Sequence, residues 1–227
     1  MLEFENVTVS LGGVRILREV SFRIAQSDTI ALIGANGAGK TTTLRTVMGH
    51  VKSTGMIRFD GQPLSQVPPA KRAGLGIGYA PEDRKLFSAF TVEENIRLPG
   101  QVARLSGPEL ERSLGRVYEI LPELKDMAGR PAGSVSGGQG KMVALGRALM
   151  IGKRLIMLDE PFQGLAAALA RRYAEALRAL RDRDPEVTLI ITESNPALLE
   201  KFTENALVIE RGEVTPRALK ARPAVSA

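Results

Sequence analysis

A glycine-rich stretch of eight residues constrains the fold of this chain more than any other segment. It reads Gly34-Ala35-Asn36-Gly37-Ala38-Gly39-Lys40-Thr41 and has the spacing G-x-x-x-x-G-K-[ST]. The apolar run 29–33 precedes it and 42–49 has a helical pattern, so the local order is strand, glycine loop, helix. That order predicts a loop whose backbone N–H groups converge on phosphate groups. The same spacing also arises by chance in a glycine turn before a helix.

The residue types of this loop suit a triphosphate. Glycines tolerate unusual backbone angles and bring no Cβ into the space of the ligand. Lys40 would reach the β- and γ-phosphates, and the Thr41 hydroxyl would bind Mg²⁺. The helix from Thr42 onward would present its positive end to the anion.

Length and composition limit the class of protein. The 227 residues suffice for one large α/β domain, or for such a domain with an inserted subdomain. No apolar run approaches the roughly 20 residues of a membrane-spanning helix. The absence of cysteine excludes disulfides and thiolate metal sites. The acidic, alternating segment 2–7 is unlike an export signal, so we expect a cytosolic protein.

The net charge of +6 raises the question of a nucleic-acid or anionic-lipid partner. Lys and Arg are scattered along the chain, usually with Asp or Glu close by. Only three Tyr and no Trp are available to stack on bases. We therefore expect no nucleic-acid partner.

Two alternating apolar segments precede the glycine loop. They occupy 2–11 and 20–24, with a Gly12-Gly13 turn in the region between them, and predict an antiparallel hairpin. In nucleotide-binding folds of this shape such a layer covers the adenine. Leu11 is the expected contact, and its aliphatic side chain would pack on the base without π-stacking.

A later apolar run ends in two carboxylates. Residues 155–158 predict a buried strand that runs directly into Asp159 and Glu160. Ligands in open α/β sheets bind beyond the carboxyl ends of the strands. Asp159 would hold Mg²⁺ through water, and Glu160 would orient or deprotonate the attacking water.

Two other predicted strands end in polar segments. The strand at 75–80 ends at Pro81-Glu82-Asp83-Arg84, where the acids either border the site or merely solvate a turn. The strand at 187–192 ends at Glu193-Ser194-Asn195. A closing hairpin is expected at 206–215.

The segment 90–150 has helical patterns instead. It includes Val135-Ser136-Gly137-Gly138-Gln139, which is followed by another helix. A serine and two glycines at a helix start predict a second anion site.

Taken together, these residues resemble the nucleotide-binding subunit of ABC transporters along essentially the whole chain. Segment 34–41 matches Walker A, 135–139 the signature motif, 155–160 Walker B with its catalytic glutamate, and 162–165 the D-loop. The resemblance implies an α/β fold of the ABC-type P-loop NTPases, with a RecA-like core, an N-terminal antiparallel β layer and an inserted α-helical subdomain.

The resemblance also implies a division of the chain. The core with its β layer would occupy approximately 1–89 and 151–215, the helical subdomain with the signature motif 90–150, and a tail 216–227. Two subunits would meet head to tail, so that the signature of one closes over the γ-phosphate held by the other.

The implied ligands are ATP and Mg²⁺. The residues expected to bind ATP are Leu11, Gly34, Ala35, Asn36, Gly37, Ala38, Gly39, Lys40, Thr41, Thr42, Ser136, Gly137, Gly138 and Gln139. The expected catalytic residues are Glu160, Lys40, Ser194 and Glu82, and those expected to bind the metal are Thr41, Asp159 and Glu82.

Two departures from the family pattern indicate a subfamily. Glu82 stands where glutamine is usual, and Ser194 stands where the family has a switch histidine. Together with the segments 78–82 and 91–95, they resemble the second ATP-binding subunit of branched-chain amino acid importers. We hypothesise from Ser194 that this subunit's own Walker A site hydrolyses ATP slowly.

The implied partners are transmembrane permease subunits and a second ATP-binding subunit, in a heterodimer or a homodimer, with a solute-binding protein only indirectly involved. The implied location is peripheral, on the cytoplasmic face of the plasma membrane, the inner membrane in bacteria. Leu86, Phe87 and Phe90 are either permease contacts or subdomain core.

The sequence also bears on other classes of nucleotide-binding protein. A soluble ABC ATPase of DNA repair or translation usually has two nucleotide domains or a long coiled-coil insertion, which do not fit this length. A regulatory subunit that binds ATP without turnover is favoured by Ser194 and disfavoured by intact Lys40, Asp159 and Glu160. The second anion site excludes an ordinary P-loop kinase or GTPase. The cargo stays open among branched-chain amino acids, urea, short amides and aromatic acids.

Overall fold

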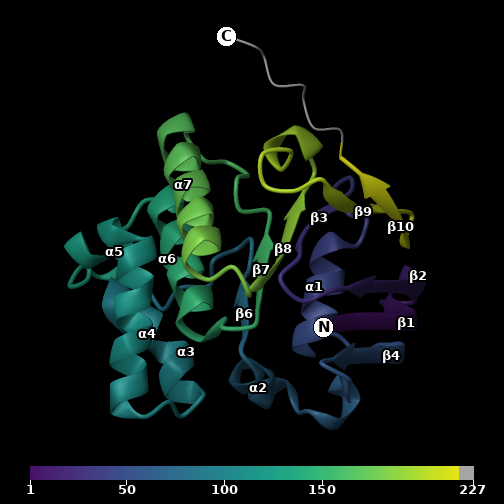
Figure 1. Ribbon diagram of the computed structural model, residues 1–227, viewed down its shortest axis with the longest axis horizontal. Helices are drawn as coiled ribbons and strands as arrows, with labels where there is room; N and C mark the ends of the chain where they lie inside the picture. Colours follow the sequence, from purple (N-terminus) through teal and green to yellow (C-terminus); the bar gives the residue numbers. More distant parts are fainter. Residues whose placement is uncertain (220–227) are drawn as a thin grey trace.

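The computed structural model describes residues 1–219 and has two β-sheets with helices between and beside them (Figure 1). The strands are β1 (Leu2–Leu11), β2 (Val14–Ile24), β3 (Thr29–Ile33), β4 (Thr54–Phe59), β5 (Gln62–Pro63), β6 (Ile77–Ala80), β7 (Leu155–Asp159), β8 (Thr188–Glu193), β9 (Asn205–Glu210) and β10 (Glu213–Ala218). The α-helices are α1 (Lys40–Met48), α2 (Pro69–Arg72), α3 (Val92–Val102), α4 (Gly107–Ile120), α5 (Pro122–Asp126), α6 (Gly137–Ile151) and α7 (Ala167–Arg183).

The smaller sheet has the order β2-β1-β4-β5 and begins with the expected hairpin. Gly12 and Gly13 both have positive φ, 55° and 82°, as a two-residue turn with a right-handed strand twist requires. Leu11 faces Val14 across this turn. The predicted antiparallel layer is therefore confirmed.

The larger sheet has the order β10-β9-β3-β8-β7-β6, and the strands from β9 to β6 are parallel. Its central strand β3 is buried on both faces. Ala31 and Ile33 belong to the core shared with the helices, and Ile30 and Leu32 to the core shared with the smaller sheet. Helix α1 lies between the two sheets (Figure 1).

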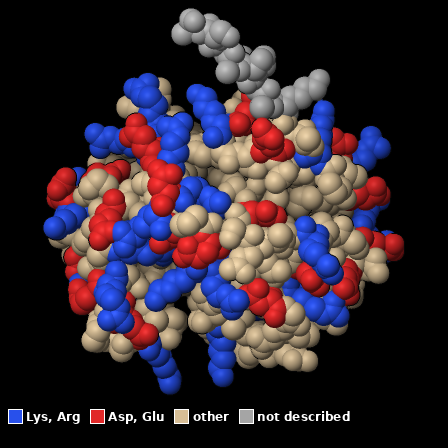
Figure 2. Space-filling model, in the orientation of Figure 1, with Lys and Arg blue, Asp and Glu red and all other residues tan. Residues whose placement is uncertain are grey.

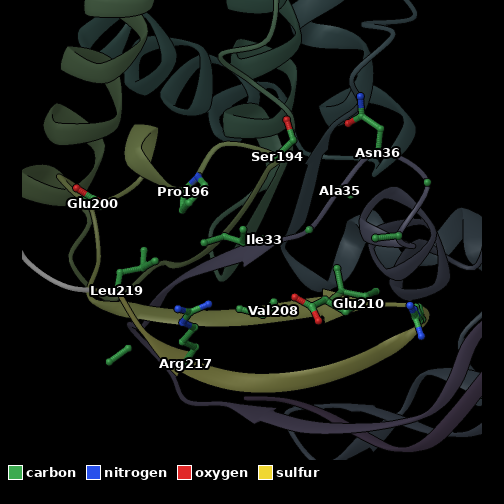
Figure 3. Close-up of a pocket in the computed structure, with 16 residues that line it drawn as sticks. Ile33, Ala35, Asn36, Ser194, Pro196, Glu200, Val208, Glu210, Arg217 and Leu219 are labelled. Carbon is green, nitrogen blue, oxygen red and sulfur yellow. The ribbon is translucent and has the colours of Figure 1, made fainter.

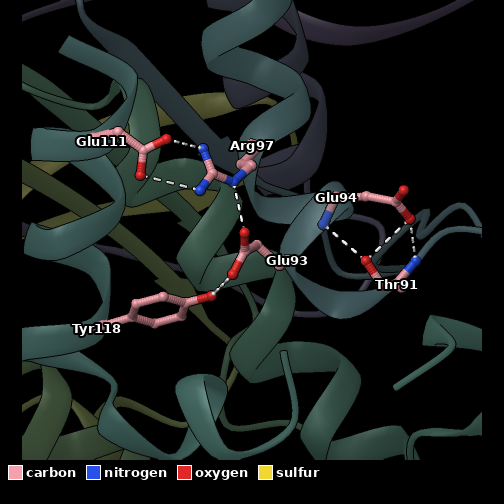
Figure 4. A network of polar contacts seen from close by, with 6 residues as sticks. All are labelled: Thr91, Glu93, Glu94, Arg97, Glu111 and Tyr118. Carbon is pink, nitrogen blue, oxygen red and sulfur yellow. Dashed lines mark hydrogen bonds and ion pairs between the residues drawn. The ribbon is translucent and has the colours of Figure 1, made fainter. Parts of the chain in front are cut away.

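Helices α3 to α6 come between β6 and β7 in the chain and lie together on the side away from the smaller sheet (Figure 1). Helix α3 begins with a side-chain cap, because Thr91 and Glu94 form a capping box. Figure 4 shows how Arg97 of α3 bonds Glu93 on its own helix at 2.8 Å and Glu111 of α4 at 2.6 Å. Tyr118 of α4 donates to Glu93 at 2.7 Å, so four side chains join α3 to α4.

Several predicted boundaries were wrong by a few residues, and β2 begins at Val14 rather than at the predicted 20. Strand β6 begins only at Ile77, because 73–75 form a 3-10 turn that ends at Gly76 with φ 85°. Helix α1 begins at Lys40 rather than at Thr42. The expected tail begins too early, since 216–218 belong to β10; a proline fits there because β10 is an edge strand. Residues 220–227 of the expected tail lie outside the described residues.

Candidate active site

The glycine loop lies between the end of β3 and the start of α1, and its glycines are required by geometry. A Cβ on Gly34 would lie 2.5 Å from the carbonyl oxygen of Ile209 in β9. Gly39 has φ 115° at the N-cap of α1, a conformation that L side chains rarely adopt. The loop can therefore pass close to β9 and still turn into the helix.

The start of α1 differs from the starts of α3, α4 and α6. Those three helices have capping boxes, in which a side chain accepts from the first backbone N–H groups. Helix α1 has no side-chain cap and no acid in its first turn. Its terminal N–H groups and the positive end of its dipole are thus available to an anion.

Lys40 is buried and points back into the loop. Its ammonium donates to the carbonyl oxygens of Gly34 at 2.7 Å and Ala35 at 3.1 Å. It also pairs with Glu160 Oε1 at 3.0 Å. These contacts hold a cation at the centre of the loop, where phosphate oxygens could compete for it.

Asp159, at the end of β7, accepts hydrogen bonds from three hydroxyl groups. They belong to Thr41 at 3.0 Å, Thr192 at 2.9 Å and Tyr79 at 3.0 Å. Burial raises the pKa of Asp159 and these hydrogen bonds lower it, with burial the larger effect. Thr41 and Asp159 thus come together from 118 residues apart.

Glu160 follows Asp159 but has different surroundings. Its backbone has φ 45°, in the left-handed region. Its N–H donates to Thr192 Oγ1 at 2.9 Å. Oε1 pairs with Lys40, whereas the buried Oε2 has no hydrogen-bond partner among the described residues. An unpartnered carboxylate oxygen beside a lysine can accept a proton or a hydrogen bond from a reactant.

A cavity of about 410 Å³ brings most of the predicted residues together. Its lining consists of Ile16, Asn36, Gly37, Gly39, Lys40, Thr41, Thr42, Glu82, Glu160 and Gln163. Glu82 therefore borders the same space as Lys40 and Glu160, which favours the site-edge interpretation over a solvated turn. Gln163 comes from the segment that matches the D-loop.

Leu11, the predicted adenine contact, lies outside the two cavities beside the glycine loop. It is 45% exposed near the hairpin turn. Ile16 of β2 lines the cavity instead. Its carbonyl oxygen would lie 3.4 Å from a Cβ on Gly39, and Gly212 packs against the same carbonyl.

Ser194 lies on the other side of the glycine loop. It lines a cavity of about 890 Å³ together with the loop residues 34–38 and with residues of β9 and β10. Figure 3 shows Ser194 and Asn36 at one side of this cavity and Glu210 and Arg217 at another. Ser194 is exposed, so a reactant bound at the loop can reach it.

The predicted second anion site does not border the cavity that Lys40 lines. Ser136 caps α6, and its hydroxyl accepts from Gln139 N at 3.2 Å. Gln139 Oε1 in turn accepts from Ser136 N at 2.9 Å. Two of the donors at this helix start therefore already have partners within the helix, and an arriving anion would have to displace them.

Four side chains that contact the turn or the carboxylates of Asp159 and Glu160 were not predicted as site residues from the sequence. Tyr79 and Thr192 bond Asp159, Glu193 accepts from Phe162 N at 2.9 Å, and Lys141 donates to the Glu160 carbonyl oxygen at 2.6 Å. Tyr79, Thr192 and Glu193 share a signal that the sequence offers, because each lies near the carboxyl end of a predicted strand. Lys141 carries no such signal.

A comparison with protein families decides among the classes of nucleotide-binding protein. The family model described as "ABC transporter" matches residues 17–163, from β2 to the segment after Glu160. The chain belongs to the ABC transporter family. The ABC-type fold predicted from the motifs is confirmed, and this member of the family is an ATP-binding ATPase subunit.

Individual relatives cover nearly the whole chain. The high-affinity branched-chain amino acid transport ATP-binding protein BraG of Pseudomonas aeruginosa is 36% identical over 99% of this chain and 97% of its own length. The lipopolysaccharide export system ATP-binding protein LptB of Haemophilus influenzae is 30% identical over 94% and 88%. The resemblance to ATP-binding subunits of branched-chain amino acid transporters is thus confirmed.

Solved structures share the fold. A nucleotide-free ATP-binding cassette from an ABC transporter superimposes with a TM-score of 0.82 at 25% identity, over 96% of this chain and 92% of that one. The dimeric cassette MJ0796 gives a TM-score of 0.84 at 24% identity, over 98% and 99%. Among residues 1–219, no helix is both long and apolar enough to cross a bilayer.

Proposed function

We propose that this ABC ATPase subunit energises an importer of branched-chain amino acids or related small solutes. The observation that carries the proposal is the 36% identity to BraG over almost the full length of both chains. The probable branched-chain amino acid transport ATP-binding protein LivF of Archaeoglobus fulgidus, at 29% identity over 94% of this chain, supports it. The similarity to LptB makes export the second candidate, at lower identity.

In the proposed site, ATP binds with its phosphates against the glycine loop. The uncapped start of α1 and the ammonium of Lys40 would supply the positive charge. Ile16 would pack beside the nucleoside, and Leu11 would contact it only if the hairpin moved. Asn36 and Gly37 border both cavities and would lie along the phosphate chain.

The donors present fit Mg²⁺. A hydroxyl and a carboxylate, those of Thr41 and Asp159, lie 3.0 Å apart beside the loop, and oxygen ligands of this kind suit a hard cation. Thr41 would bind the ion directly, Asp159 through water, and Glu82 would lie at the edge of its hydration shell. Bound Mg²⁺ would neutralise charge on the phosphates.

Hydrolysis would then depend on positioning and electrostatics. The unpartnered Oε2 of Glu160 would accept a hydrogen bond from the attacking water and orient it toward the γ-phosphate. Lys40 would stabilise charge on the transferring phosphoryl group. The phosphates would take Lys40 away from Oε1 of Glu160, leaving both carboxylate oxygens free to act on the water.

We propose that a second ATP-binding subunit completes the site and supplies donors that face the γ-phosphate from the opposite side. Residues 136–139 lie at the start of α6 outside the cavity that Lys40 lines, where a partner's ATP could reach them. The serine at the switch position favours a heterodimer, whose other subunit would carry the faster site.

We further propose a peripheral location on the cytoplasmic face of the membrane, with docking on permease subunits near residues 82–90. Phe87 and Phe90 are 48% and 40% exposed and stack with ring centroids 5.5 Å apart. Their exposure favours a role as permease contacts over subdomain core, whereas Leu86 packs partly against the helices.

A pull-down from native membranes in mild detergent tests this function. We expect the tagged chain to recover multi-span permeases and a second ATPase, with ATP hydrolysis in the purified complex. Transport of labelled leucine into proteoliposomes, with the cognate solute-binding protein added, then tests the cargo. Recovery of soluble partners or nucleic acid alone would contradict the transport role, and outward movement of a lipid would favour the second candidate.

A further inference from the structure

The turn after β7 holds the proposed catalytic glutamate in an unfavourable backbone conformation. Glu160 has φ 45°, which is costly for a residue with a Cβ. Such a conformation persists only where surrounding contacts determine it. The contacts at both ends of the segment Glu160 to Phe162 therefore bear on where the Glu160 carboxylate points.

One contact comes from helix α6. Lys141, half-buried one turn into that helix, donates from Nζ to the carbonyl oxygen of Glu160 at 2.6 Å. Burial lowers the pKa of Lys141, and the carboxylates of Glu193, Glu82 and Glu160 oppose that shift. The half-buried ammonium of Lys141 thus donates to the backbone of the turn that holds Glu160.

A second contact comes from strand β8. Glu193 is 2% exposed, and its Oε1 accepts from the N–H of Phe162 at 2.9 Å. Burial raises the pKa of Glu193 to about 7, and the nearby charge of Glu160 adds to the shift. Burying a carboxylate lowers the stability of the folded protein. We therefore infer that the bond from Glu193 to the Phe162 N–H has a functional role as well as a structural one.

We propose that Lys141 and Glu193 are positioning residues, which together hold the turn from Glu160 to Phe162 so that the Glu160 carboxylate faces the reacting water. The proposal rests on the proposed role of Glu160. Lys141 bonds the carbonyl at the start of the turn and Glu193 the N–H two residues later, so neither contact alone fixes both ends. Neither side chain lines the cavity around Lys40 and Thr41, and ATP binding should not require them.

Steady-state ATP hydrolysis by the full chain in its assembled complex tests the proposal. We expect Lys141→Met, which removes the donor, to lower kcat about tenfold with little change in KM for MgATP. Glu193→Leu, which removes the acceptor, should do the same. Lys141→Arg and Glu193→Gln keep a donor and an acceptor at these places and should restore most of kcat.

The double variant and two controls make the test specific. Because both residues act on one turn, Lys141→Met with Glu193→Leu should lose little more kcat than either change alone. Lys153→Met, at an exposed lysine after α6, should leave kcat unchanged. Thermal unfolding of each variant separates positioning from structural damage, since a structural role would lower the melting temperature and spare kcat of the folded protein.

Two results would overturn the positioning role. One is a kcat unchanged in Lys141→Met and Glu193→Leu while Glu160→Gln abolishes turnover. The other is full additivity of the two changes. Unchanged turnover in Glu160→Gln would instead contradict the role of Glu160 itself, and so the two failures can be told apart.

Discussion

Asp159 and Glu160 are neighbours in sequence, yet their environments suit the two carboxylates to different roles. Asp159 accepts from three hydroxyl groups and lies beside Thr41, which suits a carboxylate that holds a hydrated ion. Glu160 keeps one buried oxygen unpartnered, which suits a group that must accept from a reactant. The left-handed turn at Glu160 produces this difference, because an extended residue there would continue the strand.

Ser194 provides a prediction at this scale. Serine can donate one hydrogen bond and cannot become cationic, whereas a histidine could form a charge-assisted bond to the γ-phosphate. We expect Ser194→His to raise turnover at this subunit's own site by roughly ten- to a hundredfold. Single-turnover hydrolysis in the assembled pair, with the partner's site inactivated, measures it. Unchanged turnover of the pair would contradict the hypothesis of a slow site.

Glu193 provides a second prediction, on the pH dependence of stability. Its pKa is about 7 in the folded protein and near 4.5 when exposed, so the folded state binds the proton more tightly. That contribution to stability is complete below the lower value and is lost as the pH rises through about 7. Glu193→Gln lacks this loss.

The unfolding free energy of Glu193→Gln should therefore rise relative to the natural protein by about 1–3 kcal/mol between pH 5 and pH 8. Urea unfolding at both pH values measures the difference. A difference that stays constant with pH would show that Glu193 ionises in the folded protein as it does in water.

At the scale of elements, the two ends of α1 are built differently. The start has no side-chain cap, whereas the end is held by Gly49 in the left-handed conformation and by the buried Arg72. Arg72 donates to the carbonyl oxygens of Thr46 and Val47, and also to those of Leu64 and Val67. A cation at the end and an open start both suit the helix dipole.

Replacing Arg72 should destabilise the protein. We expect Arg72→Met to lower the free energy of unfolding by about 2–4 kcal/mol, because buried carbonyl oxygens lose a charged donor. Urea unfolding measures the loss, and Lys71→Met, at the exposed neighbouring position, is the matched control. A loss equal to that of the control would mean that water replaces the guanidinium at no cost.

The sequence predicted elements better than their ends or their mutual contacts. Apolar runs located β3, β7 and β8, and the glycine spacing located the phosphate loop, because both signals are local. The contact of Lys141 with Glu160 joins α6 to the turn after β7 and leaves no local pattern. The replacement of Leu11 by Ile16 at the cavity depends on how the hairpin lies over the loop, which periodicity does not encode.

At the scale of the molecule, the proposed dimer is the main consequence of the separation between the two predicted anion sites. Lys and Arg are interspersed with Asp and Glu on the face shown in Figure 2, which does not resemble a nucleic-acid surface. In the proposed dimer, ATP would lie between residues 34–41 of one subunit and residues 136–139 of the other. Because the nucleotide would contact both subunits, the dimer would depend on ATP.

Blocking hydrolysis should therefore stabilise the dimer. We expect Glu160→Gln to keep ATP binding, lose turnover and form a long-lived pair with its partner subunit, or with itself, in the presence of MgATP. Size-exclusion chromatography with light scattering, run with ATP and with ADP, measures it. A species of monomer mass under both conditions would contradict ATP-dependent closure.

The position of β3 in the larger sheet has a consequence for biosynthesis. This strand is complete at residue 33, yet its two neighbours are β8, at 188–193, and β9, at 205–210. At typical synthesis rates of about 5–20 residues per second, the strand waits roughly ten to thirty seconds for its first neighbour. During that interval the nascent chain carries an apolar strand with two unpaired edges, and its phosphate loop has no sheet to support it. The ribosome must therefore synthesise the chain beyond β9 before the phosphate loop can bind its first ATP.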